Sequence, residues 1–70
     1  MAKNVLSLTT MEKLMRSAGA DRVADKAKAA LRDYLEDVAN KISQNAMKYA
    51  SHSGRKTIKS SDIKLAIEHR

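Results

Sequence analysis

A single long stretch of helical pattern, from Asp25 to Ser53, constrains the fold of this chain more than any other feature of its sequence. It covers about 29 of the 70 residues, and no glycine or proline interrupts it before Gly54, where a left-handed cap is expected. Apolar residues recur along it in steps of three and four, which predicts one amphipathic helix. The apolar stripe consists of Ala27, Leu31, Tyr34, Leu35, Val38, Ile42, Ala46 and Tyr49.

Such a helix is too long for its own chain to cover. It would extend roughly 43 Å, whereas a compact chain of this size has a radius of gyration of about 11 Å. The sequence has no cysteine for a disulfide or a thiolate metal site, and His52 and His69 are too far apart for a local ligand pair. We therefore expect a second copy of the chain to cover the stripe, and we expect no metal and no cofactor.

Two shorter helices are expected on either side of the long one. Thr9 precedes Glu12 by three positions, which is the spacing of a capping box, and the apolar spacing continues up to Gly19. A last helix is expected over roughly residues 60–70, after a connection that contains Lys56. The predicted architecture is therefore all-α, with short, long and short helices in one chain.

Charge points to an anionic partner. The net charge is +6, from 14 Lys and Arg against 8 Asp and Glu, and most of the excess lies in segments 1–19 and 55–70. A basic helix lying on a membrane would instead concentrate Lys and Arg along its polar face. With no signal peptide and no apolar run of about 20 residues, we expect an intracellular protein with no membrane partner, and nucleic acid as the first candidate.

No constellation typical of an enzyme is present. Ser7, Ser60 and Ser61 have no His–Asp arrangement around them, and the sequence has no Gly-rich phosphate loop. Tyr34 and Tyr49 lie on the apolar stripe, where packing is expected rather than base stacking. We therefore do not expect an enzyme.

The sequence resembles archaeal histones in three segments: AGADRV at 18–23, HSGRKTIK at 52–59 and DIKLAI at 62–67. The resemblance covers almost the whole chain beyond about residue 8, so residues 1–8 are interpreted as a short N-terminal tail and 9–70 as a histone-fold domain. It implies a handshake dimer, in which two chains clasp head to tail across their long helices. It also implies binding, wrapping and compaction of double-stranded DNA without sequence specificity, by a cytoplasmic, nucleoid-associated protein.

The resemblance places the DNA-binding residues in the connections. In a handshake dimer the first connection of one chain would lie beside the second connection of the other, so that Arg22 approaches Lys56 and Thr57. The resemblance implies that Arg22 enters a minor groove while Thr57 holds its guanidinium, the base-independent arrangement found in nucleosomes. Lys13 and Arg16 on the paired first helices are expected to form another contact. Many relatives carry Arg at position 13, so we expect a phosphate contact from Lys13 rather than a minor-groove role.

Further roles follow from the same resemblance. Arg55 and Asp62 are expected to form an ion pair that fixes the second connection. Tyr49, His52, Asp62 and Leu65 are expected to join dimers into tetramers or longer arrays, with His52 near Asp62 of the neighbouring dimer, which keeps its own Arg55 through its other oxygen.

The sequence leaves three alternatives open. Gly19 is either a layer-stacking position between turns of wrapped DNA or a simple helix cap. Without the resemblance, Lys13 and Lys56 would be ordinary solvated lysines. The chain could also be a dimerisation subunit of a transcription or chromatin complex, or a helical interaction module with incidental basicity. A salt-dependent DNA shift assay distinguishes the module from a DNA-binding protein.

The uncovered stripe predicts that no folded monomer is stable. The thermal midpoint followed by circular dichroism should therefore rise as the protein concentration is raised, because association stabilises only the folded chains. A monomer in sedimentation that keeps its full helicity at micromolar dilution would contradict this expectation.

Overall fold

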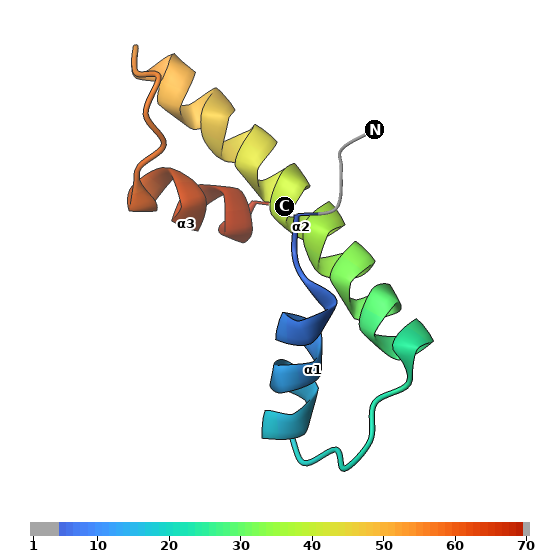
Figure 1. The fold of residues 1–70 in the computed structure, drawn as a ribbon. Helices are drawn as coiled ribbons and strands as arrows, with labels where there is room; N and C mark the ends of the chain where they lie inside the picture. The colour runs from blue at the N-terminus through green and yellow to red at the C-terminus, as the bar shows by residue number, and fades with distance from the viewer. Residues whose placement is uncertain (1–4, 70) are drawn as a thin grey trace. The chain divides into compact units, whose positions relative to one another are not determined.

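The computed structural model describes residues 5–69, in which every regular element is an α-helix (Figure 1). The helices are α1 (Leu8–Ser17), α2 (Asp25–His52) and α3 (Ser60–Glu68). The predicted all-α, short–long–short architecture is therefore confirmed. The long helix ends one residue before the predicted Ser53, and Arg70, the expected end of the last helix, lies outside the described residues.

The start of α1 differs from the prediction that Thr9 caps it. Ser7 is the N-cap: its backbone is extended, and its hydroxyl oxygen accepts a hydrogen bond from the Thr10 N–H at 3.0 Å. The carboxylate of Glu12 does not turn back to the helix start, because it binds Arg16 and Lys28 instead. The predicted capping box is therefore absent from the described chain, and Leu8 belongs to the helix rather than to the tail.

Two glycines follow the helix ends, and they are the described residues with positive φ. The φ angle is 111° at Gly19 and 76° at Gly54, values that residues with a Cβ atom adopt only at a cost. The N–H of Gly54 donates to the Ser51 carbonyl at 2.9 Å, and the N–H of Arg55 donates to the Ala50 carbonyl at 2.9 Å. These bonds satisfy carbonyls at the end of α2, as the expected cap at Gly54 should.

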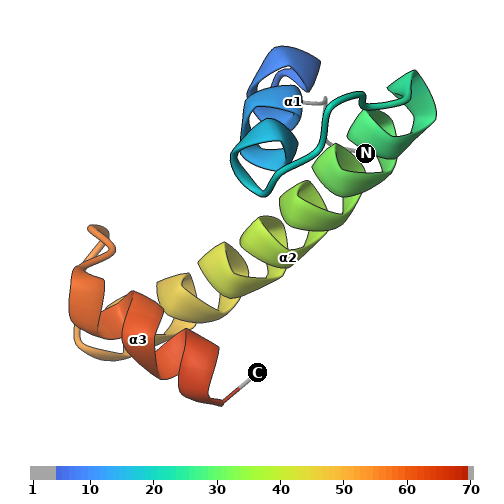
Figure 2. The same cartoon turned by 90° about the horizontal axis from the view of Figure 1, so that it is seen from below.

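The chain divides into two compact units, Met1–Asp37 and Val38–Arg70. In the first unit α1 lies beside the first part of α2, and the backbone N–H groups of Val5 and Leu6 donate to the carboxylate of Glu36. In the second unit α3 folds back beside the last part of α2. Both arrangements can be followed in two views (Figures 1 and 2). No helix within residues 5–69 is long and apolar enough to cross a membrane.

Very few apolar side chains are buried within a single chain. Met11 is the one large side chain that is fully buried among the described residues, and the other buried apolar residues are Ala46, Ala50 and Ala66. Tyr34, on the predicted stripe, is 66% exposed. Because the gain from burial follows the apolar area removed from water, three alanines and one methionine make a weak core. Most of the stripe is only partly buried within one chain, which favours a second chain as its cover.

The observed cap predicts that Ser7 and Thr9 contribute unequally to the free energy of unfolding. Ser7→Ala should lower the free energy of unfolding by about 1 kcal/mol, since it removes the acceptor for the Thr10 N–H. Thr9→Ala is the matched control and should have a much smaller effect, because Thr9 does not cap the helix. Urea unfolding at one fixed protein concentration measures both, and a larger loss for Thr9→Ala would show that Thr9 is the cap.

Candidate nucleic-acid interface

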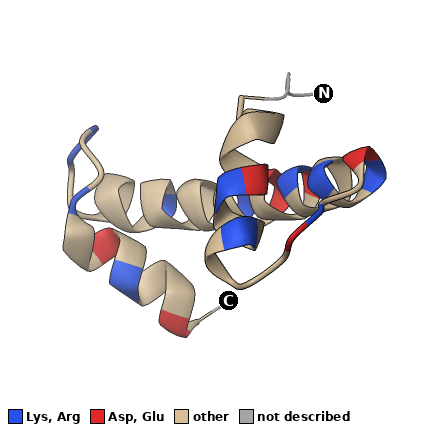
Figure 3. Ribbon diagram, turned by 60° about the horizontal axis from the view of Figure 1, so that its bottom comes forward, with Lys and Arg blue, Asp and Glu red and all other residues tan. Residues whose placement is uncertain are grey.

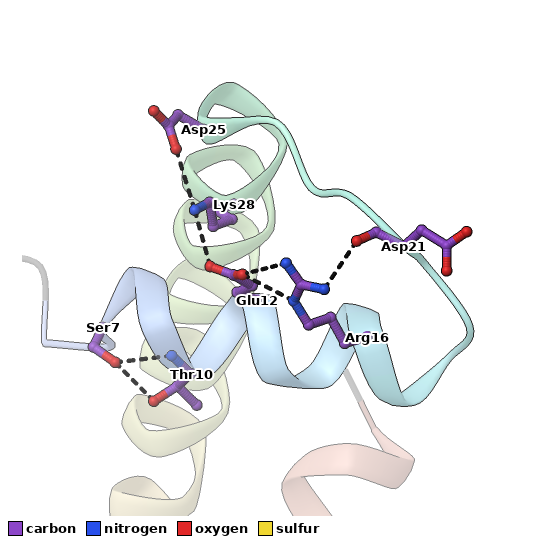
Figure 4. Close-up of polar contacts among 7 residues, drawn as sticks. All are labelled: Ser7, Thr10, Glu12, Arg16, Asp21, Asp25 and Lys28. Atoms are coloured by element: carbon purple, nitrogen blue, oxygen red, sulfur yellow. Dashed lines mark hydrogen bonds and ion pairs between the residues drawn. The ribbon is translucent and has the colours of Figure 1, made fainter.

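Four charged side chains tie α1 to the start of α2 (Figure 4). The Oε2 atom of Glu12 accepts from Arg16, at 2.8 Å from Nη2 and 2.9 Å from Nε. Its Oε1 atom lies 3.1 Å from Nζ of Lys28, which also lies 3.1 Å from Oδ1 of Asp25. Two cations and two carboxylates alternate, so their charges largely cancel within this network.

Hydrogen bonds in the network hold Glu12 and Lys28 in their charged forms. The pKa of Glu12 is lowered, first by the hydrogen bond from Arg16 and then by the one from Lys28. The pKa of Lys28 is raised, first by its hydrogen bond to Asp25 and then by the one to Glu12. Both groups therefore stay ionised around neutral pH.

The same arginine reaches the first connection, residues 18–24. The Nη1 atom of Arg16 donates to the backbone carbonyl of Asp21 at 2.9 Å. The next residue, Arg22, is exposed, and it makes no ion pair with any other described residue. Lys13 is exposed on α1, likewise without an ion pair inside the described range. Among the residues of the first unit that were predicted to bind DNA, Lys13 and Arg22 are thus uncompensated cations, whereas the charge of Arg16 is compensated by Glu12.

The second connection, residues 53–59, is fixed by a buried carboxylate. Asp62 is only 3% exposed, and it accepts from Arg55 through both oxygens, at 2.9 Å from Nη1 and 3.2 Å from Nη2. Asp62 also accepts the N–H of Lys59 at 2.8 Å, and Nη1 of Arg55 donates to the Thr57 carbonyl at 2.9 Å. The pKa of Asp62 is lowered, first by the hydrogen bond from Arg55 and then by the Lys59 N–H. The structure thus contains the pair expected between Arg55 and Asp62.

One expected detail of that pair is wrong for the single chain. The resemblance implies that Asp62 holds Arg55 through one oxygen and leaves the other for His52 of a neighbouring dimer. Both oxygens are already occupied, because the guanidinium presents two parallel N–H groups that match a carboxylate. A carboxylate oxygen can accept more than one bond, so a shared contact with His52 remains a prediction.

The remaining residues predicted for DNA binding and for dimer contacts lie in the second unit. Lys56 and Thr57 are exposed in the second connection, where Lys and Arg gather and no Asp or Glu occurs (Figure 3). Tyr49 is partly buried, His52 is exposed, and Leu65 is 39% exposed. His52 also borders a shallow hollow on α2, lined by Gln44, Met47, Lys48, Ser51 and His52. Within residues 5–69 no group of acidic and histidine side chains is arranged to hold a metal ion.

Sequence reasoning did not predict the ion pairs that Glu12 and Lys28 form with each other and with Arg16 and Asp25. The spacing of Glu12 from Arg16 and of Asp25 from Lys28 is typical of ion pairs on a helix surface, so both local pairs could have been predicted. The contact between Glu12 and Lys28 joins two helices across the first connection. No sequence periodicity indicates a contact of that kind.

The lowered pKa of Asp62 predicts a pH-dependent contribution to stability. Its folded-state pKa lies below the ordinary value, so the contribution is present above the unfolded-state pKa and is lost as pH falls through the folded-state pKa. The parent should therefore exceed Asp62→Asn in free energy of unfolding most at neutral pH, and this difference should shrink below about pH 4. Urea unfolding from pH 7 to pH 2 measures it. Glu68→Gln, an exposed carboxyl on the same helix, is the control, and an advantage that does not change with pH would contradict the assignment.

Comparison with known proteins agrees with this geometry. Residues 5–67 match the family described as histone-like transcription factor (CBF/NF-Y) and archaeal histone. The chain is 41% identical over 63 residues to the A subunit of archaeal histone HAN1 from Thermococcus zilligii, and the match covers 90% of this chain and 94% of that protein. It is 34% identical over 55 residues to probable archaeal histone 3 of Methanocaldococcus jannaschii, covering 79% and 82%. The predicted resemblance is thus confirmed, and the chain belongs to the histone-like transcription factor (CBF/NF-Y) and archaeal histone family.

Proposed function

We propose that two copies of this chain form a histone-fold dimer that binds double-stranded DNA through its phosphates, without reading base sequence, and that wraps and compacts it. Family membership supports this function, since archaeal histones are chromosome-associated DNA-packaging proteins. The exposed cations on the two connections support this function at the level of single residues. Arg22 and Lys56 are exposed on the connections without an ion pair to another described residue, whereas the neighbouring Arg16 and Arg55 are compensated by carboxylates.

The proposed contact combines both connections. In a handshake dimer Arg22 of one chain lies beside Lys56 and Thr57 of the other, so two cations, a hydroxyl and backbone N–H groups face the phosphates. Arg22 enters the minor groove. The paired α1 helices, which carry Lys13 and Arg16, add a second surface, on which Lys13 meets a phosphate. Binding then depends on the release of counterions from DNA rather than on hydrogen bonds to base edges.

Assembly along DNA is proposed to use the second unit. Tyr49, His52 and Leu65 face a neighbouring dimer, with His52 approaching Asp62, and this contact extends dimers into tetramers or longer arrays. Gly19 is proposed to lie where successive turns of wrapped DNA meet, and its positive φ also ends α1 just after the C-cap Ala18. The protein thus acts on the nucleoid in the cytoplasm by binding rather than by catalysis.

A function as a dimerisation subunit of a transcription complex is the second candidate, because the family also contains transcription factors. That function would need no cations on the connections. The presence of Arg22, Lys56 and Thr57 favours DNA packaging instead.

The proposal predicts a steep salt dependence of DNA binding. If each dimer neutralises roughly six to ten phosphates, the affinity should fall about 10³- to 10⁵-fold between 50 and 200 mM salt. Arg22→Ala or Lys56→Ala should weaken binding about equally on unrelated sequences, and each should reduce the salt slope by about one unit for every phosphate that is no longer neutralised. Fluorescence anisotropy with two duplexes of unrelated sequence measures both effects.

Lys64→Ala is the matched control, because Lys64 is an exposed lysine on α3 outside both connections. It should change the affinity and the slope less than either connection variant. A connection variant that alters base preference while leaving the slope intact would rule out this mode of binding.

A further inference from the structure

We propose that Arg16 is a positioning residue, whose guanidinium, held by Glu12, fixes the backbone of residues 21–23 and so presents Arg22 to a DNA phosphate. This inference rests on the proposed DNA binding and deepens it. It assigns Glu12 and Arg16 a task distinct from direct phosphate contact.

The geometry fixes the guanidinium on two sides (Figure 4). Nε and Nη2 of Arg16 both donate to Oε2 of Glu12, at 2.9 and 2.8 Å, while Nη1 donates to the Asp21 carbonyl at 2.9 Å. Glu12 is itself held from α2 by Lys28 at 3.1 Å. The chain of contacts therefore runs from α2 through α1 to the carbonyl that directly precedes Arg22.

Residues 21–23 have little else to order them. The turn after α1 is closed by the N–H groups of Gly19 and Ala20, which donate to the Arg16 and Met15 carbonyls at 2.9 and 3.2 Å. The first bonds of α2 go from residues 27 and 28 to the Ala24 carbonyl. Between these two sets, the bond from Arg16 to Asp21 is the one hydrogen bond that the described chain makes to residues 21–23. Without it, DNA binding would have to order this segment at an entropic cost.

The second connection contains the same arrangement of a paired arginine that donates to a backbone carbonyl. Arg55 is held by the Asp62 carboxylate and donates to the Thr57 carbonyl at 2.9 Å, next to the exposed Lys56. In both connections a compensated arginine fixes a carbonyl adjacent to an uncompensated cation. This recurrence favours positioning over phosphate contact for Arg16, because the charge of its guanidinium is already matched by Glu12.

Two substitutions distinguish a positioning role for Arg16 from simple electrostatic attraction to DNA. Glu12→Gln removes a negative charge, so simple attraction to DNA would become stronger. Arg16→Lys keeps the positive charge, so a phosphate contact would largely survive. A positioning role predicts weaker binding for both, since the glutamine no longer pairs as a carboxylate and a lysine ammonium cannot reproduce the planar fork that joins Glu12 to Asp21.

The test is the DNA affinity of the full chain, measured with one random-sequence duplex across a salt series. Arg16→Lys and Glu12→Gln should each weaken binding about five- to tenfold, with little change in salt slope. Glu68→Gln makes the same change of charge on an exposed residue of α3 and should not weaken binding. Circular dichroism verifies that every variant keeps the helicity of the parent.

Two further measurements separate positioning from general loosening of the fold. Amide hydrogen exchange at residues 21–23 of the free protein should be faster in Arg16→Lys, while exchange in the middle of α2 stays unchanged. In an Arg22→Ala background, Arg16→Lys should weaken binding less than about twofold, because the group being positioned is gone.

Tighter binding by Glu12→Gln, parental affinity in Arg16→Lys, or additive effects of Arg16→Lys and Arg22→Ala would each overturn the positioning role while leaving DNA binding intact. An Arg22→Ala variant that binds DNA as the parent does would instead overturn the proposed function, and the inference with it.

Discussion

The apolar stripe of α2 requires a second chain, because a single chain covers too little of it. Met11, Ala46, Ala50 and Ala66 are the buried apolar side chains among the described residues, and three of these four are alanines. Each buried methylene contributes only about 0.8 kcal/mol, while ordering each residue costs about 1–2 kcal/mol of backbone entropy. Tyr34, Leu14 and Ile67 remain about half exposed or more. Dimer formation, which is general in this family, would supply the missing burial, and we expect folding and association to depend on one another.

The same constraint supports the surface that we propose for DNA binding. In the family's dimer the long helices are occupied with each other, so the connections and the α1 helices remain available to an outside partner. Arg22 and Lys56, which are exposed and make no ion pair with another described residue, lie on these connections. The arginines beside them, Arg16 and Arg55, are held by carboxylates and fix backbone carbonyls. In the proposed mode of binding, each connection separates an arginine that fixes the backbone from an exposed cation that meets a phosphate.

Much of the fold could be predicted from periodicity and from two glycines. The spacing of apolar residues indicated the long helix, and Gly19 and Gly54 marked helix ends because both positions need positive φ. The start of α1 could not be predicted in this way, because Ser7 and Thr9 are both plausible caps. In the structure Ser7 caps the helix, and the carboxylate of Glu12 pairs with Arg16 and Lys28 instead of with the helix start.

The candidate site was only partly predictable, for a similar reason. Family resemblance indicated Arg55 and Asp62, but it did not indicate that both carboxylate oxygens would be occupied within one chain. The contact of Glu12 with Lys28 depends on how α1 packs against α2. Patterns within a single helix carry no information about such a contact, so it emerged only from the three-dimensional structure.

In the dimer that we propose, the first connection of one chain lies beside the second connection of the other. Cross-linking between chains measures this arrangement, because the protein has no cysteine of its own and each introduced cysteine is unique. Arg22→Cys and Thr57→Cys chains, each with a single cysteine, would be mixed, refolded together and treated with a short bismaleimide. We expect cross-links between position 22 of one chain and position 57 of the other to dominate over links between identical positions. A mixture in which the 22–57 link is absent, while the chains remain dimeric and helical, would contradict the claim.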